Sequence, residues 1–224
     1  MGSGEQDAMQ GHFMLISYSH RFILIHVPKT GGSSIRDVMS PFCFEAHNHL
    51  INRLQRRIGI NLKIPYYKWR DVPYHSTALE TKAALPDRVY NDFFTFAFVR
   101  NPWDCLVSHY HYILKSPGRT DFDLVAGMAG YDEYVAYFVN EVGSLQRDFV
   151  ADQNGTILVD YLGKFENLAE DFRYVCQKVS LNLELPHVNK SRHKNYRSYY
   201  ENQITRDRFD KHFQEDIEMF GYSF

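Results

Sequence analysis

Cysteine is scarce in this 224-residue chain, and its three cysteines lie far apart, at Cys43, Cys105 and Cys176. A sparse, odd count without paired or metal-ligand spacing argues against a disulfide framework and is typical of reduced thiols. An excess of one charge is also lacking, since 25 Lys and Arg face 27 Asp and Glu and give a formal net charge of −2. We therefore expect no nucleic-acid partner, and any anion site has to be local.

Long apolar runs are absent as well. No stretch approaches the roughly 18 uninterrupted apolar residues of a membrane-spanning helix, and residues 1–11 lack the apolar core of a signal peptide. We expect a cytoplasmic protein without stable membrane insertion; the alternative is a Golgi-luminal catalytic domain of a truncated membrane protein. Residues 1–20 are expected to be a leader or tag, partly flexible, and residues 21–224 a single domain.

The most informative segment that is present is an apolar run over residues 22–27 that ends in a loop with one lysine, Lys29, and two glycines, Gly31 and Gly32. The pattern predicts a buried strand, a tight loop and a helix that opens at Ser33. Glycines let the backbone approach an anion, the N–H groups of the helix start point at it, and the lysine adds a positive charge. Hydroxyl donors are expected from Thr30, Ser33 and Ser34. The segment therefore predicts a phosphate cradle.

Further along the chain, predicted strands and helices alternate. Residues 93–99 form a second apolar run, and Asn101 and Pro102 are typical of a helix N-cap and first helical residue. The remaining elements expected are a helix that starts with the capping box of Thr77 and Glu80, helices over 131–142 and 168–179, and a strand over 155–162. This alternation predicts an α/β, P-loop-like three-layer fold, with a central, mainly parallel sheet flanked by helices.

A second anion site is predicted where the 93–99 strand ends. Arg100 closes this strand, and Ser108 follows about two helical turns later. Arginine offers a bidentate fork and serine a neutral donor, a pair suited to a phosphate other than the one in the first loop. Two anion sites at strand ends of one α/β sheet imply a ligand with phosphates at two positions.

The chain resembles sulfotransferases that use 3′-phosphoadenosine-5′-phosphosulfate (PAPS). The stretch from His26 to Ile35 is similar to the 5′-phosphosulfate loop of that family, and the stretch from Phe98 to Ser108 to its 3′-phosphate segment. The likeness continues in Gly163–Leu168, in Asn189–Ser191 and at the end of the chain. In detail it is most similar to the carbohydrate branch that contains the heparan 2-O-sulfotransferases and small bacterial relatives.

This resemblance implies PAPS as co-substrate, adenosine 3′,5′-bisphosphate (PAP) as product, and no metal. It implies that Arg100 and Ser108 bind the 3′-phosphate, with Lys190 and Ser191 as further nucleotide-binding residues. The residues that it implies for the 5′-phosphosulfate are Lys29, Thr30, Gly31, Gly32, Ser33 and Ser34. One departure is Cys105, where many relatives carry a basic residue.

His75 is the expected general base among 11 histidines. Its unperturbed pKa, about 6.5, suits a base at neutral pH, and the following helix N-terminus favours its neutral form. The resemblance also implies a catalytic histidine here. The pairs His47/His49 and His109/His111 have i, i+2 spacing, which on a helix points two rings in different directions and predicts no metal site. Lys29 is expected to neutralise charge on the leaving phosphate.

Two other functions stay open at this stage. A nucleotide-triphosphate-dependent phosphotransferase would need magnesium and a strand-end carboxylate, for which Asp160 is the candidate. A non-catalytic nucleotide- or glycan-binding module would keep the cradle without chemistry. The acceptor is expected to be a carbohydrate or a small hydroxylated metabolite, recognised by segments 42–73 and 116–130, whose sequences carry no recognisable code.

Overall fold

The fold has a four-stranded sheet at its centre, in a computed structural model that describes residues 14–43, 72–186 and 194–224. The strand order is β1-β2-β3-β4, with β1 (Leu15–Ser17) antiparallel to β2 (Phe22–Ile25). The other two strands, β3 (Phe94–Val99) and β4 (Tyr161–Lys164), continue the sheet in parallel. The predicted, mainly parallel sheet is therefore confirmed.

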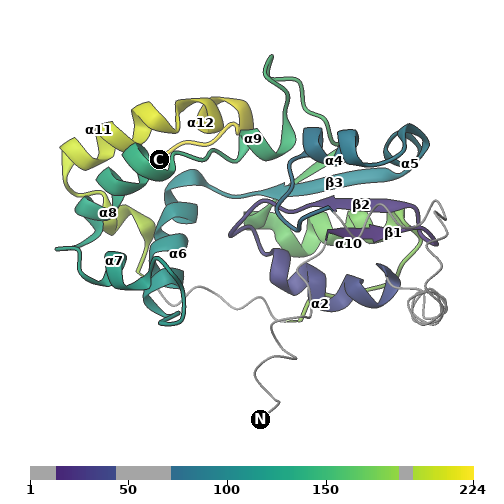
Figure 1. Cartoon of the computed structure of the whole chain (residues 1–224), viewed down its shortest axis with the longest axis horizontal. Coiled ribbons are helices and arrows are strands. Elements are labelled where there is room, and N and C mark those ends of the chain that lie inside the picture. The colour runs from purple at the N-terminus through teal and green to yellow at the C-terminus, as the bar shows by residue number, and fades with distance from the viewer. Residues whose placement is uncertain (1–13, 44–71, 187–193) are drawn as a thin grey trace, which may run out of the picture.

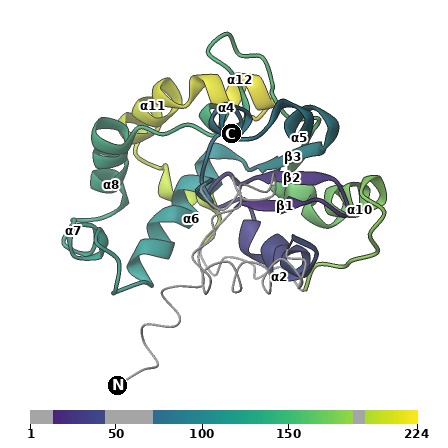
Figure 2. The ribbon, with the colours of Figure 1, turned by 45° about the vertical axis from the view of Figure 1, so that its right-hand side comes forward.

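Helices cover both faces of this sheet, which makes three layers (Figures 1 and 2). On one face lie α2 (Gly32–Cys43) and α10 (Leu168–Lys178), and on the other α4 (Ala78–Ala84) and α5 (Asp87–Asp92). The strands are apolar at successive positions because each face has its own core. Phe96 and Phe98 pack with α2 and α10, whereas the intervening Ala97 packs on the α4 side.

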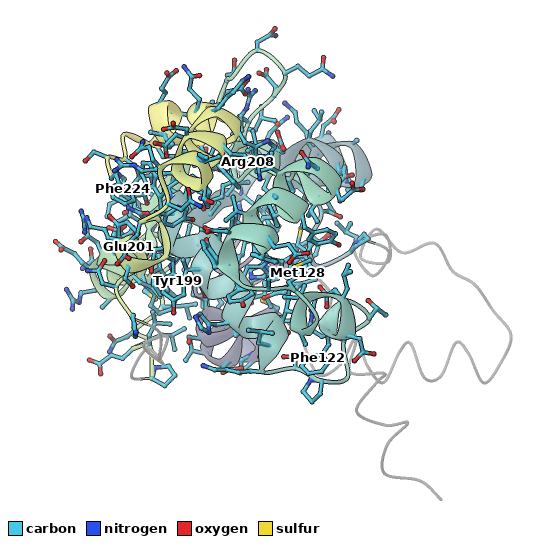
Figure 3. All side chains as sticks on the ribbon, turned by 90° about the vertical axis from the view of Figure 1, so that its left-hand side faces the viewer. Phe122, Met128, Tyr199, Glu201, Arg208 and Phe224 are labelled. Atoms are coloured by element: carbon cyan, nitrogen blue, oxygen red, sulfur yellow. The ribbon has the colours of Figure 1, made fainter. Side chains whose placement is uncertain are left out.

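A helical region extends from the sheet on the side where β3 ends (Figure 1), and Figure 3 views the molecule from this side. Its helices pack around Trp103, Tyr134 and Phe209, and Phe224 lies against Trp103 with ring centroids 5.5 Å apart. The elements of this region and its connections are α6 (Pro102–Leu114), α7 (Phe122–Ala126), α8 (Tyr131–Tyr137), η2 (Phe138–Val142), α9 (Arg147–Val150), η4 (Tyr196–Tyr199), α11 (Gln203–His212) and α12 (Gln214–Phe220). A short 3₁₀ turn, η3 (Phe165–Asn167), instead joins β4 to α10.

Several boundaries differ from the sequence predictions. Within the segment expected to be a leader, Leu15–Ser17 form β1 and are buried, because their side chains complete both cores. The strand expected over 155–162 begins only at Tyr161, because Ile157 instead makes an isolated antiparallel bridge to Ala151. The helix expected over 131–142 ends in a π-helical turn, η2. The Thr77–Glu80 capping box is confirmed.

Candidate anion-binding and catalytic site

The loop between β2 and α2 turns sharply at the edge of the sheet. Lys29 and Gly31 both have positive φ values, 67° and 89°, and the Thr30 hydroxyl donates to the Val27 carbonyl at 2.8 Å, which closes the turn. A Cβ at Gly31 would lie 2.7 Å from Leu168 Cδ2, and one at Gly32 only 1.9 Å from His26 Nε2. Both glycines are therefore required by close packing, and the predicted strand, loop and helix are confirmed.

Lys29 carries the positive charge of this loop. Its ammonium lies 3.8 Å from the centroid of the Tyr112 ring. Burial is the main cause that lowers the pKa of Lys29 to about 8, and the positive charges of Arg100 and Arg119 contribute to this shift. A bound anion would counter both effects, so this lysine gains from a negatively charged ligand.

Arg100 holds the loop from the neighbouring strand end. The side chain is 4% exposed and lies over the Phe165 ring at 4.1 Å. Its Nη1 donates to the Lys29 carbonyl at 3.1 Å, while Nε and Nη2 donate to Asp104 Oδ2 at 2.9 and 2.6 Å. Asp104, in the first turn of α6, thus orients the guanidinium. Arg100 thereby fixes the position of the lysine loop relative to β3.

The backbone of Arg100 is itself held by two buried, hydrogen-bonded side chains, those of Gln146 and Asp216. Gln146 accepts from the Arg100 N–H at 2.9 Å and donates to its carbonyl at 2.7 Å. Asp216, in α12, accepts from the N–H groups of Gln146 and Arg147, each at 2.8 Å. A carboxylate in α12 therefore supports the candidate anion site through Gln146.

Asp216 gives a pH-dependent prediction. Burial raises its pKa to about 6 from 3.8, so the folded chain holds this proton more tightly than the unfolded chain. The protonated carboxyl therefore adds roughly 3 kcal/mol to the free energy of unfolding below pH 4. This contribution is lost as the pH rises through 6. We expect Asp216→Asn to remove this part of the slope, measured by denaturant unfolding of both proteins at pH 4 and pH 7. Parallel pH dependences in the two proteins would contradict the assignment.

Two histidines meet beside the loop. His26 Nδ1 lies 3.1 Å from His75 Nδ1, and the His26 ring stacks on Tyr74 with centroids 4.0 Å apart. His26 is 8% exposed, whereas His75 is exposed just before the capped start of α4. The Arg36 guanidinium lies 3.7 Å from the centroid of the Tyr74 ring. The buried histidine is thus held in place by packing, and the exposed one lies next to it.

One cavity of about 630 Å³ brings these groups together, within the roughly 300–1,000 Å³ of small-molecule sites. It is lined by His26, Pro28, Lys29, Gly31, Gly32, Ser33, Ser34, Tyr74, His75, Arg100, Ser108, His109, Tyr112, Arg119 and Phe165. No carboxylate lines it among the described residues. Cations, hydroxyls and an exposed imidazole around one space suit a multiply anionic ligand and acid–base chemistry.

Not every predicted site residue contributes to this cavity. Thr30 is buried. Its hydroxyl was expected to donate to a ligand, but it donates to the Val27 carbonyl instead. Lys190 and Ser191 lie outside the described residues, as do His47 and His49. Sequence reasoning missed His26, Tyr74, Tyr112, Arg119 and Phe165 as lining residues. Only His26 had a signal, its place directly after the strand.

Other predicted groups take structural roles. Asp160 accepts from the backbone and hydroxyl of Thr95 at 2.7 and 2.8 Å, at the start of β3 and so at the opposite end from Arg100. His109 contacts the Tyr134 hydroxyl and His111 the Tyr199 hydroxyl, so the two rings diverge as predicted. The Cys105 thiol points to the Pro28 carbonyl at 3.8 Å, and burial raises its pKa to about 12.

Two further features are absent from the part of the chain that the structure describes. In residues 14–43, 72–186 and 194–224, no helix is long and apolar enough to cross a membrane. The same ranges contain no cluster of three or more His, Cys, Asp or Glu side chains arranged to hold a metal ion.

Similarity to other proteins extends over between half and all of the chain, depending on the protein compared. An uncharacterised protein of Archaeoglobus fulgidus is 27% identical over 111 residues, which make up 49% of this chain and 88% of that protein. The crystal structure of mouse sulfotransferase SULT7A1 complexed with PAP is similar at 13% identity, covering 100% of this chain and 95% of that chain, with a TM-score of 0.48. The sequence profile of the sulfotransferase family matches residues 12–223, and the chain therefore belongs to the sulfotransferase family.

Proposed function

We propose that this protein transfers the sulfuryl group of PAPS to an acceptor hydroxyl. The observation that carries the proposal is the single cavity in which the Lys29 loop, Arg100 with Ser108, and His75 meet. The Lys29 loop and Arg100 follow the carboxyl ends of β2 and β3, which are adjacent and parallel. Ligands of α/β sheets bind at this edge. The absence of carboxylates from the described lining disfavours a magnesium-dependent phosphotransferase, and Asp160 lies at the other end of the strand.

The cavity residues fit the two charged ends of such a nucleotide. Lys29 and the α2 N-terminus with Ser33 and Ser34 would bind the 5′-phosphosulfate, and Arg100 with Ser108 the 3′-phosphate. Gly31 and Gly32 would let the backbone of the loop lie close to the phosphosulfate. Thr30 would contribute through its backbone only. Lys190 and Ser191 remain predicted nucleotide ligands.

His75 would take the proton from the acceptor hydroxyl while the acceptor oxygen bonds to sulfur and the bond from sulfur to the 5′-phosphate oxygen breaks. The donor supplies an activated sulfuryl group, and Lys29 neutralises the charge that develops on the departing phosphate. Proton acceptance at His75 Nε2 requires its Nδ1 to carry hydrogen and to donate to Nδ1 of His26. His26 would then select the productive tautomer of His75. By contrast, burial lowers the pKa of His109 to about 4, too low for an efficient base near pH 7.

Lys29 predicts how nucleotide binding changes with pH. The ammonium form binds anions, and its pKa is about 8 without ligand. We expect the Kd for PAP to rise up to about tenfold from pH 7 to pH 9, measured by isothermal titration calorimetry. Lys29→Arg keeps its charge over this range and should show a flatter dependence, whatever its affinity at pH 7. Equal slopes in the two proteins would show that Lys29 does not bind the anion.

The proposed activity is tested by incubating the protein with isotopically labelled PAPS and a panel of sugars, phenols and alcohols, with mass spectrometry to detect an added sulfuryl group. PAP should raise the melting temperature, whereas ATP with magnesium should not, because only a ligand of the folded protein stabilises it. Stabilisation by ATP with magnesium alone would favour a phosphotransferase. The sequence predicts a carbohydrate acceptor of the heparan 2-O-sulfotransferase type, and the panel tests this prediction against phenols and alcohols.

A further inference from the structure

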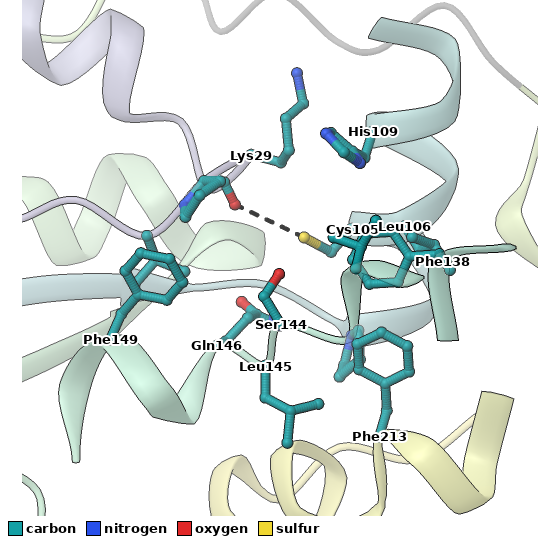
Figure 4. A pocket seen from close by; sticks show the side chains of 14 residues that line it. Lys29, Cys105, Leu106, His109, Phe138, Ser144, Leu145, Gln146, Phe149 and Phe213 are labelled. Atoms are coloured by element: carbon teal, nitrogen blue, oxygen red, sulfur yellow. Dashed lines mark hydrogen bonds between the residues drawn. The ribbon is translucent and has the colours of Figure 1, made fainter. Parts of the chain in front are cut away.

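A second cavity, of about 250 Å³, lies next to the Lys29 loop (Figure 4). It is bounded by the start of α6, by the end of η2 and by the segment that leads into α9. Leu106, Phe138, Leu145, Phe149 and Phe213 supply much of its wall. The described lining contains no carboxylate or arginine, and Lys29 is its single formal charge.

Three polar groups of this wall, those of Gln146, Cys105 and His109, have partners within the protein, whereas the Ser144 hydroxyl points into the cavity (Figure 4). Gln146 is engaged at both ends of its amide by the Arg100 backbone. The Cys105 thiol points to Pro28, and His109 Nδ1 is 2.7 Å from the Tyr134 hydroxyl. A sugar placed here would lose hydrogen bonds to water and gain few in return, whereas an apolar group would lose none.

The volume suits one small apolar group. An apolar cavity of about 150 Å³ in a protein interior binds benzene, so 250 Å³ holds a substituted or fused aromatic ring, or a short alkyl chain. Access is from the side of Ser144 and Val142, which are exposed. Figure 4 shows the Ser144 hydroxyl pointing into the cavity.

The two cavities are neighbours, because Pro28, Lys29 and His109 line both of them. A molecule whose apolar end fills the smaller cavity therefore lies beside the lysine at which the sulfuryl group is proposed to be transferred. We propose that the smaller cavity binds the apolar part of the acceptor, an aromatic ring or short alkyl chain that carries the reacting hydroxyl. This inference rests on the proposed sulfotransferase function for its role, but binding to the cavity does not depend on catalysis.

The test uses 2-naphthol as probe and calorimetry without donor, so that binding is separated from transfer. Ser144→Phe places a ring in the cavity and should weaken 2-naphthol binding by more than about tenfold, with PAP affinity changed by less than about twofold. Gln153→Phe adds the same bulk at an exposed turn and should leave both affinities unchanged. Glucose should not compete with 2-naphthol.

Equal 2-naphthol binding by the Ser144→Phe protein, or no binding by the unmodified protein at millimolar concentration, would overturn the inference. If 2-naphthol binds as expected but no acceptor of the panel is sulfated, the cavity assignment stands and the proposed function fails. If instead only sugars without an apolar group are sulfated, and 2-naphthol neither binds nor inhibits, the function stands and the cavity assignment fails.

Discussion

Replacing His75 with alanine is expected to lower kcat by roughly 10²- to 10⁴-fold, the usual contribution of a positioned general base. His75 is exposed and contacts the loop region through His26, so its removal should leave PAP affinity within about twofold of the original value. Initial rates of sulfate transfer and calorimetric PAP binding, measured on the same preparation, separate the two effects. A transfer rate within about threefold of the original would eliminate His75 as the base.

Variants of His26 test how the base is oriented. Asparagine can present an acceptor oxygen near the position of Nδ1, so His26→Asn should retain much of the rate. His26→Leu keeps much of the side-chain volume but has no hydrogen-bond acceptor, and we expect it to lower kcat by roughly ten- to a hundredfold. Losses of this size are typical when a group that orients a metal-binding histidine is removed. Similar losses in the two variants would assign His26 a packing role only.

Substituting Gly32 with alanine is expected to raise the Kd for PAP by roughly ten- to a hundredfold. The added Cβ would lie 1.9 Å from His26 Nε2, so the imidazole or the loop has to move, and overpacking of this kind costs about 1–3 kcal/mol. Because His26 also contacts His75, sulfate transfer should fall as well. Calorimetric titration with PAP measures the first effect and initial rates the second.

The chain offers a matched control for this substitution. A Cβ at Gly118 would meet no atom within 4 Å, so Gly118→Ala should change neither PAP affinity nor rate. Combining Gly32→Ala with His26→Ala removes the clash and should restore PAP binding without restoring transfer. If the double variant binds PAP as weakly as Gly32→Ala alone, displacement of His26 is not the cause.

Local patterns predicted the parts of the site that adjacent residues build. The β2–loop–α2 unit, the helix cap at Asn101 and the capping box at Thr77 follow from short-range rules, and each is present. The sheet and its layers followed from alternating apolar runs. The three-residue β1 was missed because a pattern this short carries no periodic signal.

Contacts between distant residues could not be predicted in the same way. His26 and His75 are 49 positions apart, and Arg100 and Gln146 are 46 apart; nothing in either local sequence indicates its partner. The Thr30 hydroxyl was expected to face the ligand, but it donates to the Val27 carbonyl instead. The sequence allows either direction, and only the geometry of the turn decides between them. Asp160 was the candidate magnesium ligand of the phosphotransferase alternative, but its carboxylate accepts hydrogen bonds from Thr95 in β3. The sequence alone does not distinguish such a structural carboxylate from a metal ligand.

The clamp from Asp216 through Gln146 to Arg100 has a consequence for biosynthesis. Arg100 positions the Lys29 carbonyl, yet the carboxylate that anchors this arrangement is made 187 positions after Lys29, as the numbering from 29 to 216 gives. Domains generally fold as units, so a contact between distant segments forms only after both segments have been made. A nascent chain that still lacks α12 therefore has the residues of the Lys29 loop but not the Asp216 contact that supports them through Gln146 and Arg100.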